Sequence, residues 1–437
     1  MRDVLLLSII VVVSVVAIWR PWIGVLAWTW VSVMNPHRYT WVAAELPVAA
    51  IVAGATLIGV VLTRDKRHVF VTPESGTLAL FMLWICITYP FSDSVQGSYE
   101  MWSKVMKVDF MILVTLLVLY TKRHIVLFAW VVVLSLAYYG VKGGVFTLLH
   151  GGDFRVYGPP GGFVEDNNEL ALALIVVIPL MRFLQLQCQR KWLKLSWSLA
   201  MLLTAAAAIG SHSRGALIGL IAMGLFLWTR SERKLGLGIL IVITAIGLVA
   251  FMPSQWTERM ETIGAYEEDG SAMGRINAWK MAWNLASSRV TGGGFDIYTP
   301  HIFAQYAPNP LDVHAAHSIY FQVLGEHGFI GLLLFLLIWF FTWRSAGWLY
   351  RKGKEEPESR WASDLGGMCQ ASLVGYGVAG AFLSLAYFDL PYNIMVMVVL
   401  AKRLVEGRVQ SPEAPIAPES VLDSREMLAR RDARESL

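Results

Sequence analysis

The longest polar stretch of the sequence, residues 254–328, carries most of its chemically active side chains. It contains GRINAWKMAW at 274–283, GGGF at 292–295, HAAHS at 314–318 and GEHG at 325–328. An apolar run at 235–252 precedes this stretch, and another at 318–343 overlaps its end. We therefore expect the rest of the chain to form a frame that places this segment at a membrane surface.

The composition is that of a membrane protein. Of the 437 residues, 56% are hydrophobic and 16% are charged, against about 45–50% and 25% in soluble domains. The net charge of +4 sits in short basic clusters, which suits membrane orientation better than nucleic-acid binding. The apolar start, residues 1–19, lacks a small-residue cleavage site, so we expect it to be retained. These features predict an all-α polytopic membrane protein.

Apolar runs and basic clusters together predict the topology. The runs lie at 4–19, 22–34, 42–62, 77–91, 107–120, 124–148, 168–187, 195–211, 215–229, 235–252, 318–343, 366–386 and 388–401. Basic clusters such as 64–67, 122–123 and 344–360 belong on the cytoplasmic side under the positive-inside rule. Placing all of them inside predicts about twelve spans, with both chain ends in the cytoplasm.

This topology divides the chain into four parts. Residues 1–252 form a first transmembrane region, in which the Trp-rich segment 22–34 is interfacial or re-entrant. Residues 253–317 form one large periplasmic loop with the catalytic elements, 318–402 form a second transmembrane region, and 403–437 form a disordered cytoplasmic tail. The polar stretches 151–168 and 210–215 also fall on the outer side, so the candidate chemistry converges on one face.

Two arginines are candidates for binding an anion. Arg214 stands at the rim of an apolar run, where it either faces a polar cavity or snorkels to the interface. Arg275 precedes Trp279 and Trp283 at spacings of four, which places all three on one face of a helix. The alternative for both arginines is plain interfacial anchoring. Because a guanidinium forms forked hydrogen bonds to phosphate, the two could clamp a diphosphate, with Arg289 a weaker candidate.

The histidines of the HAAHS motif offer a base rather than a metal site. His314 and His317 follow Asp312, but no HExxH motif or cysteine pair accompanies them, so we expect no metal. His317 stands at the mouth of the next span, where an imidazole can take a proton from a sugar hydroxyl; the alternative is a structural loop histidine. The acidic run 267–269 lacks Asp-x-Asp spacing and is expected to be solvated surface. EDNN at 165–168 is expected to cap the next helix.

These motifs, in this order, resemble the O-antigen ligase and polymerase superfamily. The resemblance rests on SRGA at 213–216, Arg275 with Trp279, GGGF at 292–295, HS at 317–318 and EHGFIG at 326–331. The family is polytopic with one large periplasmic loop, so the resemblance covers residues 42–402 and implies a GT-C-like glycosyltransferase. The N-terminal part, with NPHRY at 35–39, also resembles ligases associated with exosortase systems.

The resemblance implies that a polysaccharide is transferred from undecaprenyl diphosphate to the lipid A–core oligosaccharide, at the periplasmic face of the bacterial inner membrane. Arg214 and Arg275 would bind the donor diphosphate, and His317 would activate the acceptor hydroxyl. Secondary site candidates are His314, Trp279, Glu326 and Arg289. Attack opposite the leaving diphosphate would invert the anomeric configuration. Because arginines would stabilise the phosphate charge, neither a metal nor another cofactor is expected.

Three alternatives stay open. An O-antigen polymerase would use the same donor with another lipid-linked glycan as acceptor. A protein O-oligosaccharyltransferase would use a Ser or Thr hydroxyl. A transporter would instead place ionisable groups near the bilayer midplane, beside broken helices in paired halves. The outstanding polar groups cluster at one rim, and Asp109 and Asp389 are expected at span ends, so the sequence favours the enzyme.

Overall fold

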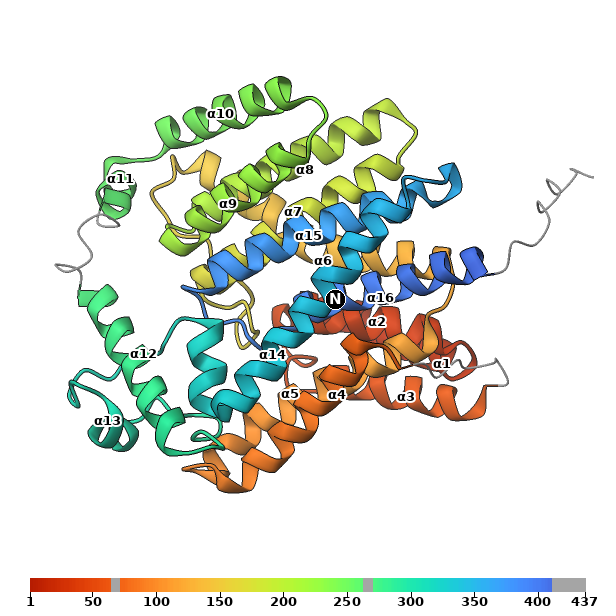
Figure 1. The fold of residues 1–437 in the computed structure, drawn as a ribbon. Coiled ribbons are helices and arrows are strands. Elements are labelled where there is room, and N and C mark those ends of the chain that lie inside the picture. The colour runs from red at the N-terminus through yellow and green to blue at the C-terminus, as the bar shows by residue number, and fades with distance from the viewer. Residues whose placement is uncertain (64–70, 262–269, 411–437) are drawn as a thin grey trace, which may run out of the picture.

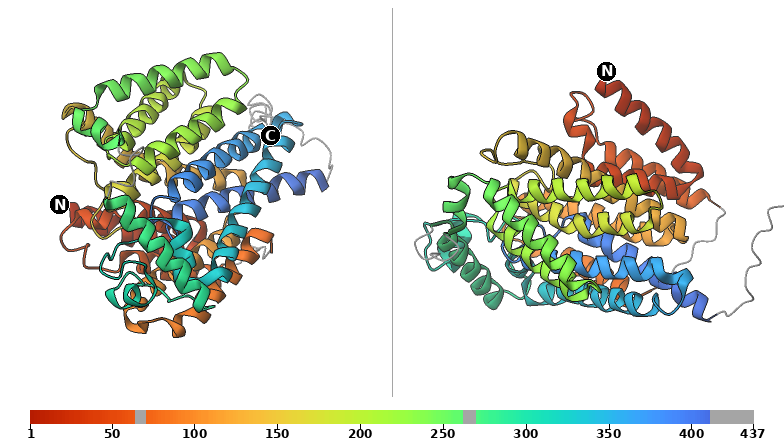
Figure 2. Two further views of the ribbon diagram at one scale, coloured as in Figure 1. Left: turned by 60° about the vertical axis from the view of Figure 1, so that its left-hand side comes forward. Right: turned by 90° about the horizontal axis from the view of Figure 1, so that it is seen from above.

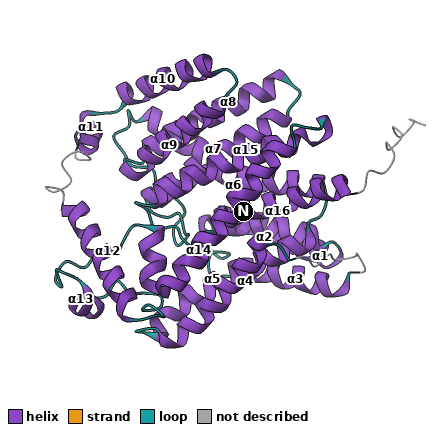
Figure 3. Cartoon of the chain, viewed as in Figure 1, coloured by secondary structure: helices purple, strands orange, loops and turns teal. Residues whose placement is uncertain are grey.

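The computed structural model describes residues 1–63, 71–261 and 270–410, and this part of the chain consists of helices and loops with no β-strand (Figure 1, Figure 3). The prediction of an all-α protein is confirmed. The acidic run 267–269 and residues 411–437 of the tail lie outside the described residues. The last helix, α16 (Asp389–Gln410), continues beyond residue 403, where the sequence predicted the tail to begin.

Seven helices in the described part are long and apolar enough to cross a membrane. They are α1 (Arg2–Trp19), α4 with η2 (Pro73–Phe91), α6 (Lys122–Leu149), α7 (Asn167–Gln187), α8 (Lys191–Ile209), α10 (Lys234–Phe251) and α14 (Ile319–Lys352). Two more apolar helices, α2 (Pro21–Met34) and α3 (Val48–Leu62), are shorter. The seven candidate membrane-spanning helices are fewer than the twelve spans that the sequence predicts.

Four further helices pack within the same bundle although they are not among the seven that are long and apolar enough to cross a membrane. They are α5 (Val95–Val118), α9 (Arg214–Arg230), α15 (Arg360–Gly380) and α16. Helix α9 has 17 residues, and α5 carries Lys104, Lys107 and Asp109. Asp109 lies inside α5 and is buried, so its predicted place at a span end is wrong, whereas Asp389 does begin α16.

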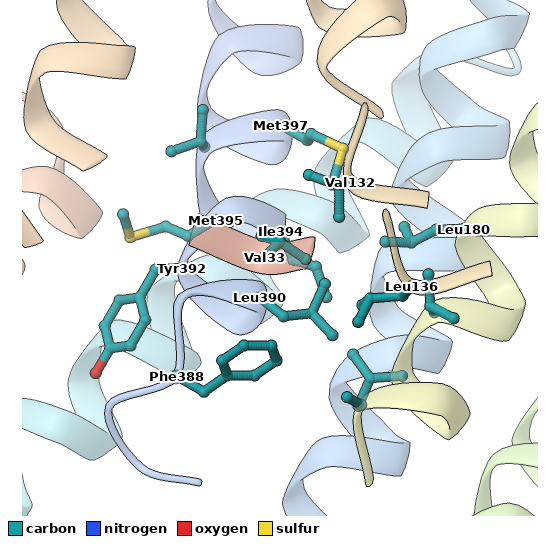
Figure 4. Close-up of a cluster of buried hydrophobic side chains, with 14 of the residues drawn as sticks. Val33, Val132, Leu136, Leu180, Phe388, Leu390, Tyr392, Ile394, Met395 and Met397 are labelled. Carbon is teal, nitrogen blue, oxygen red and sulfur yellow. The ribbon is translucent and has the colours of Figure 1, made fainter. Parts of the chain in front are cut away.

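Helix α16 lies at the centre of the bundle. Its side chains from Asp389 to Ala401 are buried on every side, as expected for a helix that is apolar all round over most of this length. Figure 4 shows side chains of α16 and the preceding Phe388 beside residues of three other helices, namely Val33 of α2, Val132 and Leu136 of α6, and Leu180 of α7. The N-terminal and C-terminal parts of the chain therefore share one core.

The polar segment gathers at one end of the bundle. Helices α11 (Ser254–Glu261), α12 (Gly270–Ser288) and α13 (Pro300–Tyr306) lie on the side opposite to the connection between α14 and α15 (Figure 1, Figure 2). Helix α12 packs along the first part of α14. The bundle thus presents residues 254–261 and 270–317 on a single face, next to the starts of α7 and α9 (Figure 1, Figure 2).

The two glycine motifs bind each other. The N–H groups of Gly293 and Gly294 donate to the carbonyls of Gly325 and Glu326, each over 2.9 Å. Helix α14 breaks just beyond, at Gly328, whose φ of 67° lies in the left-handed region that glycine adopts without steric cost. The glycine turn therefore satisfies carbonyls at the end of the first part of α14, and both motifs have a structural role.

Candidate active site

His317 ends the extended segment before α14. Its φ of 43° is left-handed, a conformation that costs a non-glycine residue on the order of 1–3 kcal/mol and needs support from its surroundings. Trp279 of α12 supplies that support, because its Nε1 donates to the Ala316 carbonyl over 2.7 Å. The Trp279 ring also stacks on Phe321 of α14, with 5.0 Å between ring centroids. The backbone around His317 is thus fixed between α12 and α14.

The His317 imidazole lies between charges of opposite sign. Burial is the main cause that lowers its pKa from 6.5, and the charge of Arg275, one turn before Trp279, lowers it further. Asp166, on the other hand, raises the pKa. The His317 Nδ1 is buried and has no hydrogen-bond partner in the described part of the chain. Burial therefore favours the neutral imidazole, and one of its ring nitrogens is not engaged by any described residue.

Asp166 joins the site from the start of α7. It caps this helix, accepting the Asn168 N–H over 2.8 Å, so the predicted helix cap is confirmed. Burial alone would raise the Asp166 pKa, but hydrogen bonds with Glu169 and Asn168 and the charge of His317 bring it below its usual value. We did not foresee that this carboxylate faces His317. The available signal was its position on the same outer rim as the HAAHS motif.

Arg214 is the first residue of α9, after the capping residue Ser213. The turn before it is held from two sides. The Asn167 amide donates to the Ser211 carbonyl over 2.6 Å, and the His212 Nε2 lies 2.8 Å from the Gly152 carbonyl. Because Asn167 follows Asp166, these contacts fix the start of α9 beside the start of α7.

Arg214 and Arg275 come from helices that each approach Phe382. A Cβ atom on Gly215 would lie 2.9 Å from the Phe382 Cβ, so this glycine allows α9 to pack closely there. The Phe382 ring lies 6.5 Å from that of Trp279, centroid to centroid. The structure therefore gathers the starts of α7 and α9, the Arg275 face of α12 and the His317 loop in one region.

The secondary candidates divide into two groups. Trp279 supports the loop as described, and His314 pairs with Asp312 over 2.7 Å at the surface. Glu326 is buried in α14, where its carboxylate accepts a hydrogen bond from the Tyr387 hydroxyl. Arg289 donates to the Phe91 carbonyl, and its distance from Arg275 along the helix is about 21 Å at 1.5 Å per residue. Glu326 and Arg289 thus make structural contacts away from the loop that carries His317.

Two family models match the chain. One, described as "O-Antigen ligase", matches residues 199–336, and the other, described as "Family of unknown function (DUF5935)", matches residues 1–188. No curated protein matches the sequence. The first match spans Arg214, Arg275 and His317, whereas Asp166 falls within the second. The match over residues 199–336 supports membership of the O-antigen ligase superfamily, whose glycosyltransferase-like enzymes use lipid-linked glycans and lipid acceptors.

Proposed function

We propose that the protein is an O-antigen ligase that transfers an undecaprenyl-diphosphate-linked polysaccharide to the lipid A–core oligosaccharide. The observation that carries this proposal is the His317 imidazole, held in a strained loop by Trp279, with a buried Nδ1 that no described residue engages and with its pKa lowered by burial and by Arg275. A base that is already deprotonated near neutral pH suits proton removal from a sugar hydroxyl. The family match supports the donor and acceptor classes in general.

In the proposed reaction, His317 takes the proton of the acceptor hydroxyl as its oxygen attacks the anomeric carbon of the donor. The bond from this carbon to the diphosphate breaks, and the electron pair leaves with the diphosphate. Arg214 and Arg275 stabilise the developing negative charge through forked hydrogen bonds. Attack from the side opposite the diphosphate inverts the anomeric configuration.

The proposal places this site at the periplasmic face of a bacterial inner membrane, in a chain of about twelve spans. Cysteine-accessibility labelling tests the topology. Positions in 270–316 should react with a reagent supplied from the periplasm, and cysteines at Lys122, Lys234 and Lys352 should react only after the membrane is permeabilised. Labelling of the 270–316 segment from the cytoplasm alone would rule out the periplasmic site.

Reconstitution with purified lipid-linked donor and lipid A–core acceptor tests the reaction itself. We expect transfer to proceed in the presence of EDTA, because arginines rather than a divalent cation are assigned to the diphosphate. In a deletion strain, the polysaccharide ladder on the lipid A–core should disappear while lipid-linked polymer persists. Loss of the polymer as well would point to a polymerase instead.

A second candidate function keeps the donor and changes the acceptor to a Ser or Thr hydroxyl of a protein. The observation in its favour is that residues 1–188 match a family of their own, separate from the O-antigen ligase match. The NPHRY segment at 35–39 lies in that region. Transfer to a protein acceptor, with none to lipid A–core in the same reconstituted assay, would establish this candidate over the first.

A further inference from the structure

A second group of cations lies under the loop that leads into α7. Lys104 of α5 is half-buried, and its ammonium stands 3.7 Å from the centroid of the Phe163 ring in this loop. Phe163 in turn contacts Phe388, with 6.1 Å between ring centroids. The loop therefore covers Lys104 and anchors to the residue before α16.

The same loop lies against Arg38, in the short helix η1 (Pro36–Tyr39). A Cβ atom on Gly161 would lie 3.1 Å from the Arg38 Cζ and 3.3 Å from both terminal nitrogens, so the glycine backbone rests on the guanidinium. The φ of Gly161 is 69°, which also favours glycine. Glu165, the acidic residue at the end of this loop, accepts the Gly161 N–H over 2.7 Å. Arg38 is thus held beneath the turn of the loop.

These two cations repel each other and lack a close counter-ion. The charges of Arg38 and Lys104 are near enough to interact unfavourably. The carboxylates within electrostatic range of Lys104 are Asp389 and Glu100. Among the described residues, no carboxylate oxygen lies within 4.0 Å of the Lys104 ammonium or the Arg38 guanidinium. Lys104 is half-buried whereas Arg38 is exposed, and two like charges held close together are costly unless an anion joins them.

The chemistry of the pair favours a phosphoryl group as that anion. A guanidinium presents two parallel donors to two oxygens, and an ammonium adds a compact charge that can reach a third. A phosphoryl group has enough oxygens and charge for both cations, whereas a single carboxylate has two oxygens. The Phe163 ring over Lys104 supplies an apolar side to the site, which strengthens such contacts.

We propose that Arg38 and Lys104 form a binding site for a phosphoryl group, carried by a membrane lipid headgroup or by a phosphorylated glycan, beneath the 158–165 loop. This site goes beyond the proposed glycan transfer and does not depend on it. It is separate from Arg214 and Arg275, which belong to α9 and α12. Its loop continues directly into Asp166, so an occupant would contact the segment that ends at the carboxylate whose charge acts on His317.

Thermal unfolding of the full chain tests the site. The background should carry Arg214→Ala and Arg275→Ala, so that the proposed diphosphate site does not contribute. We expect glucose 6-phosphate to raise the Tm, and glucose at the same concentration and ionic strength not to. Adding Arg38→Gln and Lys104→Gln should weaken the affinity derived from the Tm series by about 100-fold or more, since two charge-assisted contacts are lost. Lys107→Gln, an exposed cation on the same helix, should leave the affinity unchanged.

A lipid arm distinguishes the source of the phosphoryl group. Nanodiscs of phosphatidylcholine with phosphatidylserine added provide an anionic lipid probe, and nanodiscs of phosphatidylcholine alone provide the control. Stabilisation by the anionic lipid that depends on Arg38 and Lys104 assigns the site to a headgroup, and stabilisation by glucose 6-phosphate alone assigns it to a glycan. An equal response of the Arg38→Gln/Lys104→Gln chain and its parent to both probes would overturn the proposal.

A measurement without ligand separates binding from a structural role. If the pair exists to bind an anion, removing one of two repelling charges should leave the Tm of the phosphate-free protein unchanged or higher. Lys104→Gln should therefore not destabilise the protein while it weakens phosphate binding. A lower Tm of Lys104→Gln in phosphate-free buffer, with phosphate affinity intact, would assign Lys104 to folding instead.

Discussion

His317 and His327 lie ten positions apart and have opposite surroundings. The His317 imidazole is half-buried beside Arg275 and Asp166, in a left-handed loop conformation. The His327 imidazole is completely buried, and its Nδ1 lies 2.9 Å from the Thr88 hydroxyl. Aromatic rings surround it, namely Phe81, Phe295 and Tyr387, each in an edge-to-face contact.

The difference teaches that residue type alone does not identify a base. Each histidine has a ring nitrogen that no described residue engages, but of the two only His317 has charged neighbours, and its backbone carries strain that packing has to maintain. His327 instead joins helix α14 to α4, where the Trp84 indole also donates to its carbonyl over 2.8 Å. We therefore assign chemistry to the first histidine and stability to the second, and the predictions below test that division.

The largest expected effect is the loss of glycan transfer caused by the His317→Ala substitution. Removing the proposed base should lower kcat by about 10²- to 10⁴-fold, the typical contribution of a positioned acid–base group. The Tm should change little, because the loop is held by Trp279. His327→Ala should do the reverse and lower the free energy of unfolding by about 2–5 kcal/mol, as for other large-to-small core substitutions.

Reconstituted transfer measures kcat, and circular-dichroism melting measures the stability of each variant. His314→Ala is the matched control, because it removes a neighbouring imidazole that pairs with Asp312 at the surface, and it should affect transfer much less. If the folded His327→Ala enzyme lost transfer to the same degree as His317→Ala, the division between the two histidines would be wrong.

The next effect concerns the two arginines proposed to bind the diphosphate. Arg275→Lys and Arg214→Lys keep the charge but lose the forked geometry, so each should lower kcat/KM by about 10- to 100-fold. Lys cannot bind two oxygens of the diphosphate in one plane. Arg289→Lys is the control, since Arg289 contacts the Phe91 carbonyl away from the loop. Full activity of both Lys variants would leave the two arginines as interfacial anchors.

The fold class was predictable because it follows from composition and hydropathy, which record burial in lipid. The convergence of polar stretches on one end was also predictable, since the charge bias sets the sides of the loops. The expected twelve spans stay a prediction, since seven helices of the described part are long and apolar enough to cross a membrane. Helix α5 extends from Val95, well before its apolar run at 107–120, because charged residues such as Lys104 can be helical and half-buried when an aromatic ring covers them.

Part of the candidate site could be named from the sequence, and its residues stay a prediction. The residues Arg214, Arg275 and His317 were named from motif order, and the structure brings their elements together around Trp279 and Phe382. The charge of Asp166 on His317 was not predictable, because it depends on the tertiary placement of α7 against the loop. The pairing of the glycine motifs was missed for the same reason, since it joins residues 292–294 to 325–328.

A smaller effect, on stability alone, is expected at the glycine turn beside His327. A Cβ atom on Gly292 would lie 2.6 Å from the Gly325 carbonyl oxygen, and its φ is 66°. Gly292→Ala should therefore lower the free energy of unfolding by roughly 1–3 kcal/mol, measured by thermal or denaturant unfolding. Gly270→Ala, with open space around its Cβ position, is the control. An unchanged melting curve for Gly292→Ala would show that the turn is not rigid.

The smallest effect is a displacement of the pH profile, and it tests the charges around His317 directly. Activity should fall with decreasing pH, because a protonated imidazole cannot accept a proton, and the midpoint of this fall should lie below pH 6.5. Asp166 raises the His317 pKa, so Asp166→Asn should move the midpoint to lower pH. Arg275 lowers that pKa, so Arg275→Gln should move the midpoint to higher pH.

Each displacement should be about one pH unit or less, since these groups are partly solvated. The measurement is kcat/KM against pH for the residual activity of each variant, normalised to its own plateau. His314→Ala should give a shift to higher pH as well, because His314 also lowers the His317 pKa. Changes in substrate affinity alone would scale the curves without moving their midpoints. Midpoints that stay in place in Asp166→Asn and Arg275→Gln would therefore show that His317 is not the titrating base.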